Sequence, residues 1–219
     1  KHGLISKNFD IILCAQLDRE LDDIEDVNSD YSDRGLRVSQ FHKCERLGFL
    51  EYNKWETADP FSPKIDFTKF PELRYVNINS EITEKQLNDL LCTAKHLKGL
   101  TIKINSPIPD CLCDLEDLRY LEIINYGNVT LPDCMENIVN LKYLRLAVQG
   151  VGFDNNLSKI VCNIPSLEIL KIEGGNIFNI EPTILNMHHL KQLDVSGVDS
   201  INFNTEFSKL DSLEIFQIS

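Results

Sequence analysis

The sequence predicts an α/β solenoid, a horseshoe in which a curved parallel sheet with one strand per repeat lies on the concave face. Two observations lead to this prediction. An apolar pattern of the form L-x-x-L-x-[IVL] recurs in eight copies, the first of them loose, at spacings of 21 to 26 residues. Each copy is followed by a segment that must return the chain to the next strand. The repeats cover residues 44–219, and residues 1–43 precede them as an N-terminal capping segment.

Each copy predicts one strand. Its second and third apolar residues are two positions apart, which is the alternation of a strand, so both point into the core. The strands are expected to begin near residues 49, 75, 99, 120, 143, 169, 192 and 215. One repeat cannot bury its own apolar side, so stacked neighbours must form the core. We therefore expect Leu121, Leu144 and Leu170 to be almost fully buried.

The return segments predict short helical turns. In residues 131–140, Pro132 suits the first turn of a short helix, and Met135 and Ile138 lie three apart on one face. Residues 108–115 repeat this arrangement with Pro109.

In pattern and period the chain resembles the leucine-rich-repeat family. That family often has Asn or Cys three residues after the last apolar strand position, where it satisfies buried backbone groups, and here only Asn105 fits. The irregular repeats and the Leu-Pro segments resemble those of intracellular plant immune receptors of the nucleotide-binding type. This resemblance implies the ligand-sensing part of a receptor in plant defence. The alternative is a substrate-receptor subunit of a ubiquitin ligase, of the F-box type, whose repeats are also irregular.

The outward strand positions of successive repeats are expected to line up in rows about 4.8 Å apart. The middle row contains Glu51, Asn77, Thr101, Glu122, Arg145, Lys171, Asp194 and Gln217. The row before it contains Phe49, Tyr75, Gly99, Tyr120, Tyr143, Ile169, Gln192 and Ile215. The row after it contains Asn53, Asn79, Lys103, Ile124, Ala147, Glu173, Ser196 and Ser219.

Tyr and Arg are enriched at binding hot spots. The row that begins with Phe49 contains Tyr75, Tyr120 and Tyr143, and we call it the tyrosine row. We predict that a protein partner binds here, with Tyr120, Glu122, Tyr143 and Arg145 at the centre of the site. The full predicted set is Tyr75, Tyr120, Glu122, Tyr143, Arg145 and Lys171. The alternative is that the tyrosine rings only shield the sheet.

Motifs of catalysis are absent from the sequence. It contains no G-x-x-x-x-G-K-[ST], H-E-x-x-H or G-x-S-x-G. Cys111 and Cys113 form C-x-C rather than the C-x-x-C of a zinc site. His96, His188 and His189 precede strand starts and are expected to be exposed turn residues. We predict that the chain is not an enzyme and uses no metal or other cofactor.

Composition limits the partners and the compartment. The formal net charge of −12 disfavours general binding to nucleic acids and to anionic membranes, and no apolar run is long enough for a membrane helix. The seven cysteines are odd in number and scattered, which favours reduced thiols in the cytoplasm or nucleus. Two glycosylation sequons, at Asn128 and Asn156, are about as many as chance provides in this Asn-rich chain.

The ends of the chain carry three further expectations. Residues 9–15 and 36–41 predict two apolar strands. The acidic segment 18–33 between them predicts a solvated loop, or else an element that docks on a basic partner or folds back to regulate binding. Residues 55–69 predict a long return segment around Trp55. No capping repeat follows the last strand, 213–219, so we expect further repeats, a partner or a second copy to cover it. The alternative is that this edge strand is tolerated uncovered because it is short and twisted.

Overall fold

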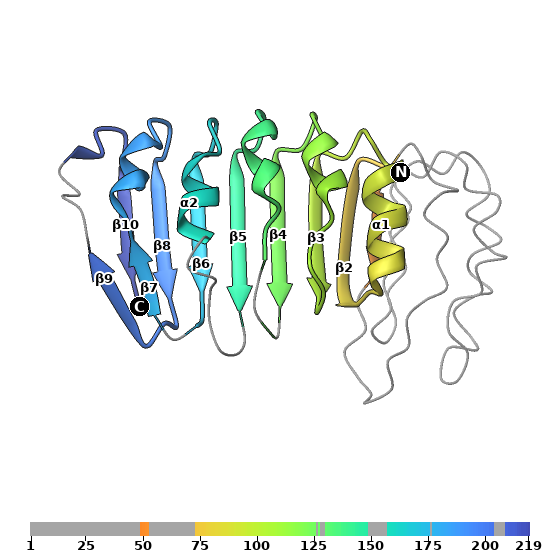
Figure 1. Ribbon diagram of the computed structural model, residues 1–219, viewed down its shortest axis with the longest axis horizontal. Coiled ribbons are helices and arrows are strands. Elements are labelled where there is room, and N and C mark those ends of the chain that lie inside the picture. The colour runs from red at the N-terminus through yellow and green to blue at the C-terminus, as the bar shows by residue number, and fades with distance from the viewer. Residues whose placement is uncertain are drawn as a thin grey trace, which may run out of the picture.

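A single parallel sheet organises the molecule (Figure 1). The computed structural model describes residues 49–52, 73–125, 127, 130–148, 157–175, 177–203 and 209–219. Within these residues, eight strands pair in the order β1-β2-β3-β4-β5-β6-β8-β10. Their bounds are β1 Phe49–Tyr52, β2 Tyr75–Glu81, β3 Gly99–Ile104, β4 Tyr120–Asn125, β5 Tyr143–Val148, β6 Ile169–Glu173, β8 Gln192–Ser196 and β10 Ile215–Ile218.

Each of these strands begins at the residue that the repeat spacing predicts. The tyrosine row and the middle row are also confirmed, because the strand register pairs their members from β1 to β10. The third row is wrong at one point. The pairing of β2 with β3 is irregular after Ile78, and Glu81 rather than Asn79 lies opposite Lys103.

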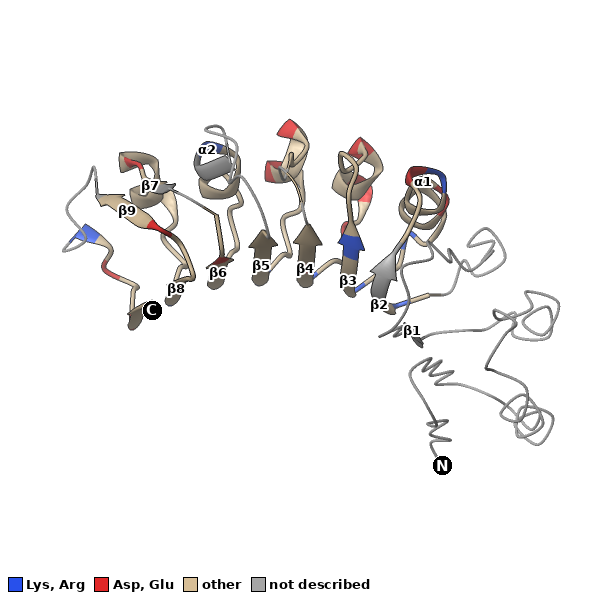
Figure 2. Ribbon diagram, turned by 90° about the horizontal axis from the view of Figure 1, so that it is seen from below, with Lys and Arg blue, Asp and Glu red and all other residues tan. Residues whose placement is uncertain are grey.

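Helical turns cover the convex side of the sheet (Figure 2). They are α1 Glu84–Thr93, η4 Asp110–Asp114, η5 Asp133–Asn137, α2 Leu157–Cys162 and η6 Pro182–Asn186. Thr83 begins α1 with a reciprocal cap: its hydroxyl accepts from the Gln86 N–H at 3.2 Å, and the Gln86 side chain accepts from the Thr83 N–H at 3.0 Å. The predicted helical turns at 108–115 and 131–140 are confirmed as single 3-10 turns.

A second, two-stranded parallel sheet was not predicted. It consists of β7 Ile177–Ile180 and β9 Ser200–Phe203, and Asn202 Nδ2 donates to Asn179 Oδ1 across it at 2.9 Å. The chain reaches it through glycines with positive φ, Gly174 at 78° after β6 and Gly197 at 62° after β8. Such angles favour glycine because it has no Cβ.

The core runs continuously between the sheet and the convex turns. Leu121 and Leu144 are 0% exposed and Leu170 is 2% exposed, so the predicted burial is confirmed. The expected role of Asn105 is wrong, because that residue is exposed. Asn125 is the buried one instead, and its Oδ1 accepts from the Gly127 N–H at 2.6 Å. No helix among the residues placed by the structure is long and apolar enough to cross a membrane.

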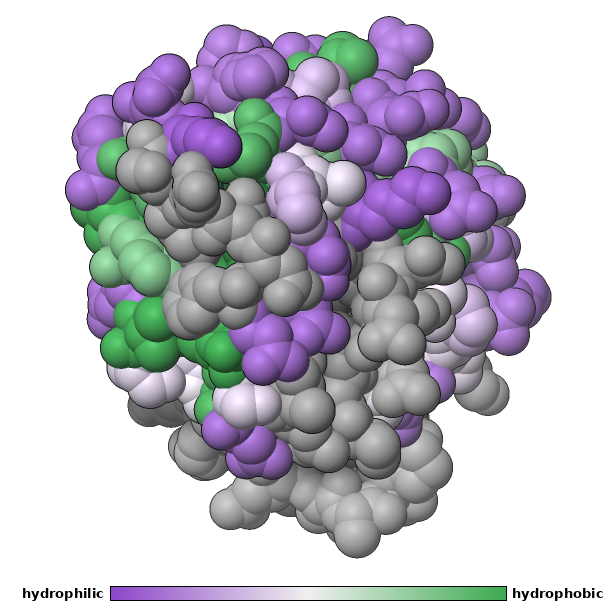
Figure 3. All heavy atoms as spheres, turned by 60° about the vertical axis from the view of Figure 1, so that its left-hand side comes forward, coloured by the Kyte–Doolittle hydropathy of each residue, from purple (hydrophilic) through white to green (hydrophobic). Residues whose placement is uncertain are grey.

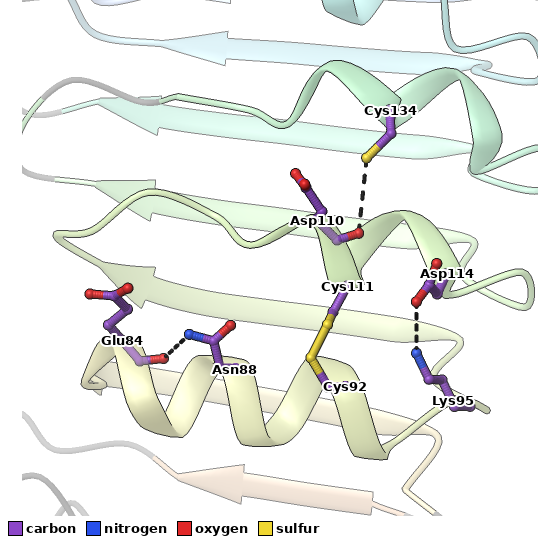
Figure 4. Close-up of a disulfide and its surroundings, with 8 residues drawn as sticks. All are labelled: Glu84, Asn88, Cys92, Lys95, Asp110, Cys111, Asp114 and Cys134. Carbon is purple, nitrogen blue, oxygen red and sulfur yellow. Dashed lines mark hydrogen bonds and ion pairs between the residues drawn. A yellow bond between two sulfur atoms is a disulfide. The ribbon is translucent and has the colours of Figure 1, made fainter.

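Two disulfides staple three consecutive convex elements. Cys92 of α1 is bonded to Cys111 of η4, as Figure 4 shows. Cys113 of η4 is bonded to Cys134 of η5. The expectation of reduced thiols is therefore wrong for these four residues. The spacing shows why: each bonded pair lies about one repeat apart, so stacking brings the two sulfurs together. Cys162 is a free, buried thiol.

Several expectations concern residues outside the described ranges. They are the capping segment 1–43 with its apolar strands, the acidic segment 18–33, and the return segment 55–69.

Candidate functional site: a tyrosine and ion-pair face on the sheet

Two tyrosines form a flat aromatic surface on the outward side of β4 and β5. Tyr120 and Tyr143 are register partners, and their rings stack with centroids 4.4 Å apart and planes 9° apart. Tyr120 is 36% exposed, so the stacked pair reaches solvent. Tyr75, at 47% exposed, extends the aromatic row toward the N-terminus. These three residues are surface tyrosines, as the sequence predicts.

Gly99 stands between Tyr75 and Tyr120 in the row, and because it has no side chain the Tyr75 ring can lie over it. A Cβ on Gly99 would lie 2.8 Å from Cδ1 of Tyr75 and 3.8 Å from Cβ of Tyr120. The Tyr75 ring therefore occupies the space that a side chain at position 99 would need. The aromatic surface therefore extends from β2 to β5 because the position on β3 is glycine.

Next to the tyrosines, one guanidinium bridges two carboxylates. Arg145 Nε donates to Glu173 Oε1 at 2.8 Å and Arg145 Nη2 donates to Glu173 Oε2 at 2.5 Å, which is a two-point contact. Arg145 Nη1 also donates to Glu122 Oε1. Glu122, Arg145 and Glu173 lie on β4, β5 and β6, so this cluster ties three strands together across the face.

The environment of this cluster fixes its protonation. Hydrogen bonding to Glu173 raises the pKa of Arg145 further above its ordinary value. The same hydrogen bonds lower the pKa of Glu173. Burial, and then the hydrogen bond to Glu122, raise the pKa of Tyr120, whose hydroxyl donates to Glu122 Oε2 at 2.6 Å. At neutral pH the cluster therefore contains the Arg145 guanidinium, the Glu173 carboxylate and the neutral phenol of Tyr120.

The predicted residue Lys171 is part of a neighbouring pair. Its Nζ lies 3.6 Å from Asp194 Oδ2, and the two side chains are 29% and 14% exposed. Asp194 Oδ1 is buried and has no hydrogen-bond partner within the described residues. Lys171 is the register partner of Arg145, so the pair continues the charged surface toward β8.

The structure brings Tyr120, Glu122, Tyr143 and Arg145 into one cluster, as the predicted centre of the site requires. Tyr75 is not part of this cluster, but its ring lies over Gly99 and continues the aromatic surface from Tyr120. Sequence reasoning missed Glu173 as the main partner of Arg145. The row pattern places Glu173 one strand along from Arg145 and two positions after Lys171, but register alone pairs Arg145 with Lys171. Whether these residues bind a partner stays a prediction.

The histidines and other metal-ligating side chains of the described residues form no second candidate site. Among the residues placed by the structure, no group of three or more His, Cys, Asp or Glu side chains is arranged to hold a metal ion. His96, His188 and His189 are exposed, as predicted for turn residues.

At the other end of the solenoid, β10 exposes apolar side chains. Ile215, Phe216 and Ile218 are 49%, 40% and 51% exposed. Figure 3 shows apolar residues, in green, among hydrophilic ones on this end of the molecule. The expected cover over this end stays a prediction.

Comparison with known proteins identifies the architecture. No protein-family model matches the chain, and no curated protein sequence matches it. Among solved structures, a leucine-rich-repeat protein of Leptospira interrogans matches with a TM-score of 0.64 and 19% identity, over 81% of this chain and 44% of its own length. The internalin InlF of Listeria monocytogenes matches with a TM-score of 0.59 and 19% identity, over 84% of this chain and 50% of its own. The internalin InlC2 of the same species matches with a TM-score of 0.51 and 13% identity, over 81% of this chain and 83% of its own.

The chain thus spans half or less of the length of the first two proteins. Such low identities carry information about the fold and not about ligands. Together with the repeat spacing and the parallel sheet, they show that this chain has the leucine-rich-repeat fold.

Proposed function

We propose that the chain is a recognition module that binds a protein partner on the concave face of its sheet. The observation that carries this proposal is the stacked Tyr120–Tyr143 pair beside the Glu122–Arg145–Glu173 cluster. It combines exposed aromatic area with fixed charges, and residues of these types dominate binding energies at protein interfaces. We propose no catalytic role, because the tyrosines and charges satisfy one another and leave no activated nucleophile.

The alternative interpretation is that the tyrosines shield the sheet and bind nothing. Both roles expose rings on the outer side, so geometry alone does not separate them. They differ in one respect. A shielding ring contributes to folding stability alone, whereas a hot-spot ring also contributes to the affinity for a partner. An experiment must therefore measure both quantities on the same variants.

The test is capture of partners from the native source with the full chain, followed by quantitative mass spectrometry. The Tyr143→Ala variant removes the ring that stacks on Tyr120, and Val139→Ala is the matched control. Val139 is also a surface side chain, 54% exposed, on the turn after η5. A partner of the concave face is retained by the wild-type chain and by Val139→Ala, and its affinity falls by more than about 1 kcal/mol with Tyr143→Ala.

Arg145→Ala gives the second arm, with the same expected loss of more than about 1 kcal/mol in affinity. Because it also leaves two carboxylates without their cation, its unfolding midpoint is measured alongside. If every captured protein binds both variants as well as it binds the wild type, the concave cluster is not the binding site and the shielding interpretation holds.

Two narrower roles remain proposals about a longer protein. The module serves as the ligand-sensing part of an intracellular plant immune receptor, or else as the substrate receptor of a ubiquitin ligase. The irregular repeats support both alternatives. The parent sequence separates them, since a nucleotide-binding domain upstream indicates the receptor and an F-box upstream indicates the ligase subunit.

The expected cytoplasmic or nuclear location stays a prediction. The two disulfides count against it, because structural disulfides persist in oxidising compartments and are rare in the cytosol. Fractionation of the native source settles this question. Recovery in a secretory or extracellular fraction with the disulfides intact would overturn the cytoplasmic location.

A further inference from the structure

A row of basic residues borders the tyrosine row. We call Arg74, Lys98, Arg119 and Lys142 the basic row. Each follows the first leucine of its repeat and directly precedes the strand residue that belongs to the tyrosine row. Three of the four side chains are exposed and that of Lys98 is partly exposed. The net charge of the whole chain is −12, so four adjacent bases are a local reversal of sign.

The backbone fixes the spacing of this row. The N–H of Lys98 donates to the carbonyl of Arg74 at 2.7 Å. The N–H groups of Arg119 and Lys142 donate in turn to the carbonyls of Lys98 and Arg119, each at 2.9 Å. Residues joined in this way are about 4.8 Å apart, so the basic row extends over about 14 Å.

The charges of the basic row are largely unneutralised. Within the part of the chain that the structure describes, no ion pair forms at Arg74, Lys98 or Arg119, and only Lys142 has a carboxylate partner, Glu168. Asp117, on the turn before β4, lies 3.6 Å from His96 Nδ1.

The acids of the neighbouring sheet surface do not offset the row either. Glu122 and Glu173 are bound to Arg145, and Asp194 lies beside Lys171. Other acids lie on the convex elements, where Figure 2 shows red, and the corresponding positions of later repeats hold Glu168 and Glu214. The four adjacent bases thus form a positive border on the sheet side, which ends at Glu168, the next residue in this position along the repeats.

We infer that the basic row and the tyrosine row together receive a short acidic segment of a protein partner, in extended conformation across the strands. An extended chain advances about 3.3 Å per residue, so about four to five residues span the basic row. Its side chains alternate between two sides. Carboxylates on one side face the basic row, and the other side contacts the tyrosine rings. This inference rests on the proposed function and names the chemistry of its partner.

A protein segment fits better than a nucleic acid. The phosphates of a nucleic acid continue beyond the basic row, where the strongly acidic protein repels them. This repulsion acts over about one Debye length, about 8 Å at physiological salt. A peptide with a few neighbouring carboxylates neutralises the basic row and brings no further negative charge to the acidic surface around it.

The test uses the full chain and a fluorescein-labelled peptide, Glu-Gly-Glu-Leu-Glu-Gly-Glu, in anisotropy titrations at several salt concentrations. The first control is the same peptide with Gln in place of Glu. The row variant is Arg74→Gln/Lys98→Gln/Arg119→Gln. Its matched control is Lys85→Gln/Lys95→Gln/Lys159→Gln, which removes the same charge from other exposed surfaces. Circular dichroism and thermal unfolding confirm that both variants fold.

The expected result is saturable binding of the acidic peptide that weakens with salt and falls by at least about tenfold in the row variant, with the control variant close to wild type. The inference is overturned if the wild type does not bind the acidic peptide, if the Gln peptide binds equally well, or if both variants lose the same affinity. It is also overturned if an oligothymidylate binds more tightly than the peptide and loses its binding in the row variant. That result assigns the row to nucleic acid.

The capture assay separates this inference from the proposed function. A partner that is lost with Tyr143→Ala but retained by the row variant leaves the concave binding site standing and removes only the acidic segment.

Discussion

The aromatic rings of Tyr120 and Tyr143 stack in register across β4 and β5, with centroids 4.4 Å apart. This distance is close to the spacing of neighbouring strands, about 4.8 Å. The stack is thus a direct product of an in-phase repeat, since both residues occupy the same position of consecutive copies. It places a flat aromatic surface at the middle of the sheet, next to the Arg145 cluster.

Leu144→Ala tests the assigned core. Leu144 is 0% exposed, and removal of its isobutyl group leaves a cavity between repeats. The substitution should lower the free energy of unfolding by about 2–5 kcal/mol, measured by urea denaturation. The control Val139→Ala, at a side chain 54% exposed, should change it by less than about 0.5 kcal/mol. Equal midpoints for Leu144→Ala and the wild type would contradict the register.

Gly174→Ala tests the turn after β6. Gly174 has φ of 78°, and a Cβ there would clash with the backbone carbonyl oxygen of Val148. Alanine disfavours the left-handed backbone conformation, and the Val148 carbonyl oxygen belongs to the main chain and cannot easily move away. The variant should therefore be less stable by about 2 kcal/mol or more. Gly127→Ala is the control, since a Cβ at position 127 finds its nearest neighbour, Asn125 Oδ1, at 3.5 Å. A Gly174→Ala variant as stable as Gly127→Ala would show that the turn is built differently.

Reduction of the disulfides should destabilise the repeats between α1 and η5. The bonds join cysteines 19 and 21 residues apart, and closing loops of this size contributes about 3 kcal/mol each in the chain-entropy model. Thermal unfolding with and without reductant measures the loss, and peptide mapping under non-reducing conditions should find Cys92 linked to Cys111 and Cys113 linked to Cys134. The buried thiol of Cys162 provides the control, because Cys162→Ala should leave the effect of the reductant unchanged. A melting temperature that reductant does not shift would show that the two disulfides do not stabilise these repeats.

Glu168 should make the free energy of unfolding depend on pH in the acidic range. Lys142 Nζ and Lys191 Nζ lie 2.8 and 2.7 Å from its two carboxylate oxygens, and their hydrogen bonds lower its pKa from 4.5 to about 2. A group whose folded pKa is depressed stabilises the fold above its unfolded pKa. This contribution is lost as the pH falls from about 4.5 toward 2.

The measurement is urea denaturation of wild type and Glu168→Gln between these pH values. The variant should lack this part of the acid dependence, while Glu136→Gln, at an exposed carboxylate of η5, serves as the control for loss of a charge. If Glu168→Gln and the wild type lose stability in parallel, the two lysines do not hold the carboxylate in solution.

The strands were predictable because one constraint determines them. In an in-phase parallel repeat, the spacing of Leu118, Leu141 and their equivalents sets both where each strand starts and which residues are register partners. The contiguity of Tyr120 with Tyr143, and of Glu122 with Arg145, follows from the same constraint. The irregular pairing after Ile78 breaks it, so the prediction for Asn79 was wrong.

Other features depend on contacts that a strand pattern does not contain. The disulfides form between return segments, where the position of Cys92 on α1 and of Cys111 on η4 depends on how neighbouring turns stack. The two-point contact of Arg145 with Glu173 depends on side-chain reach across strands rather than on register. The pairing of β7 with β9 requires the left-handed glycines that redirect the chain after β6 and β8.

The bridge from Arg145 to Glu122 and Glu173 has a consequence for the thermodynamics of recognition. A flexible side chain immobilised at an interface costs about 0.5–1.5 kcal/mol of conformational entropy. Here Glu122 and Glu173 already hold the Arg145 guanidinium, and Tyr143 and Glu122 already hold Tyr120. The entropy of these side chains is therefore lost on folding, before any partner binds. A face that is rigid beforehand associates with little rearrangement, and it rejects molecules whose shape requires it to yield.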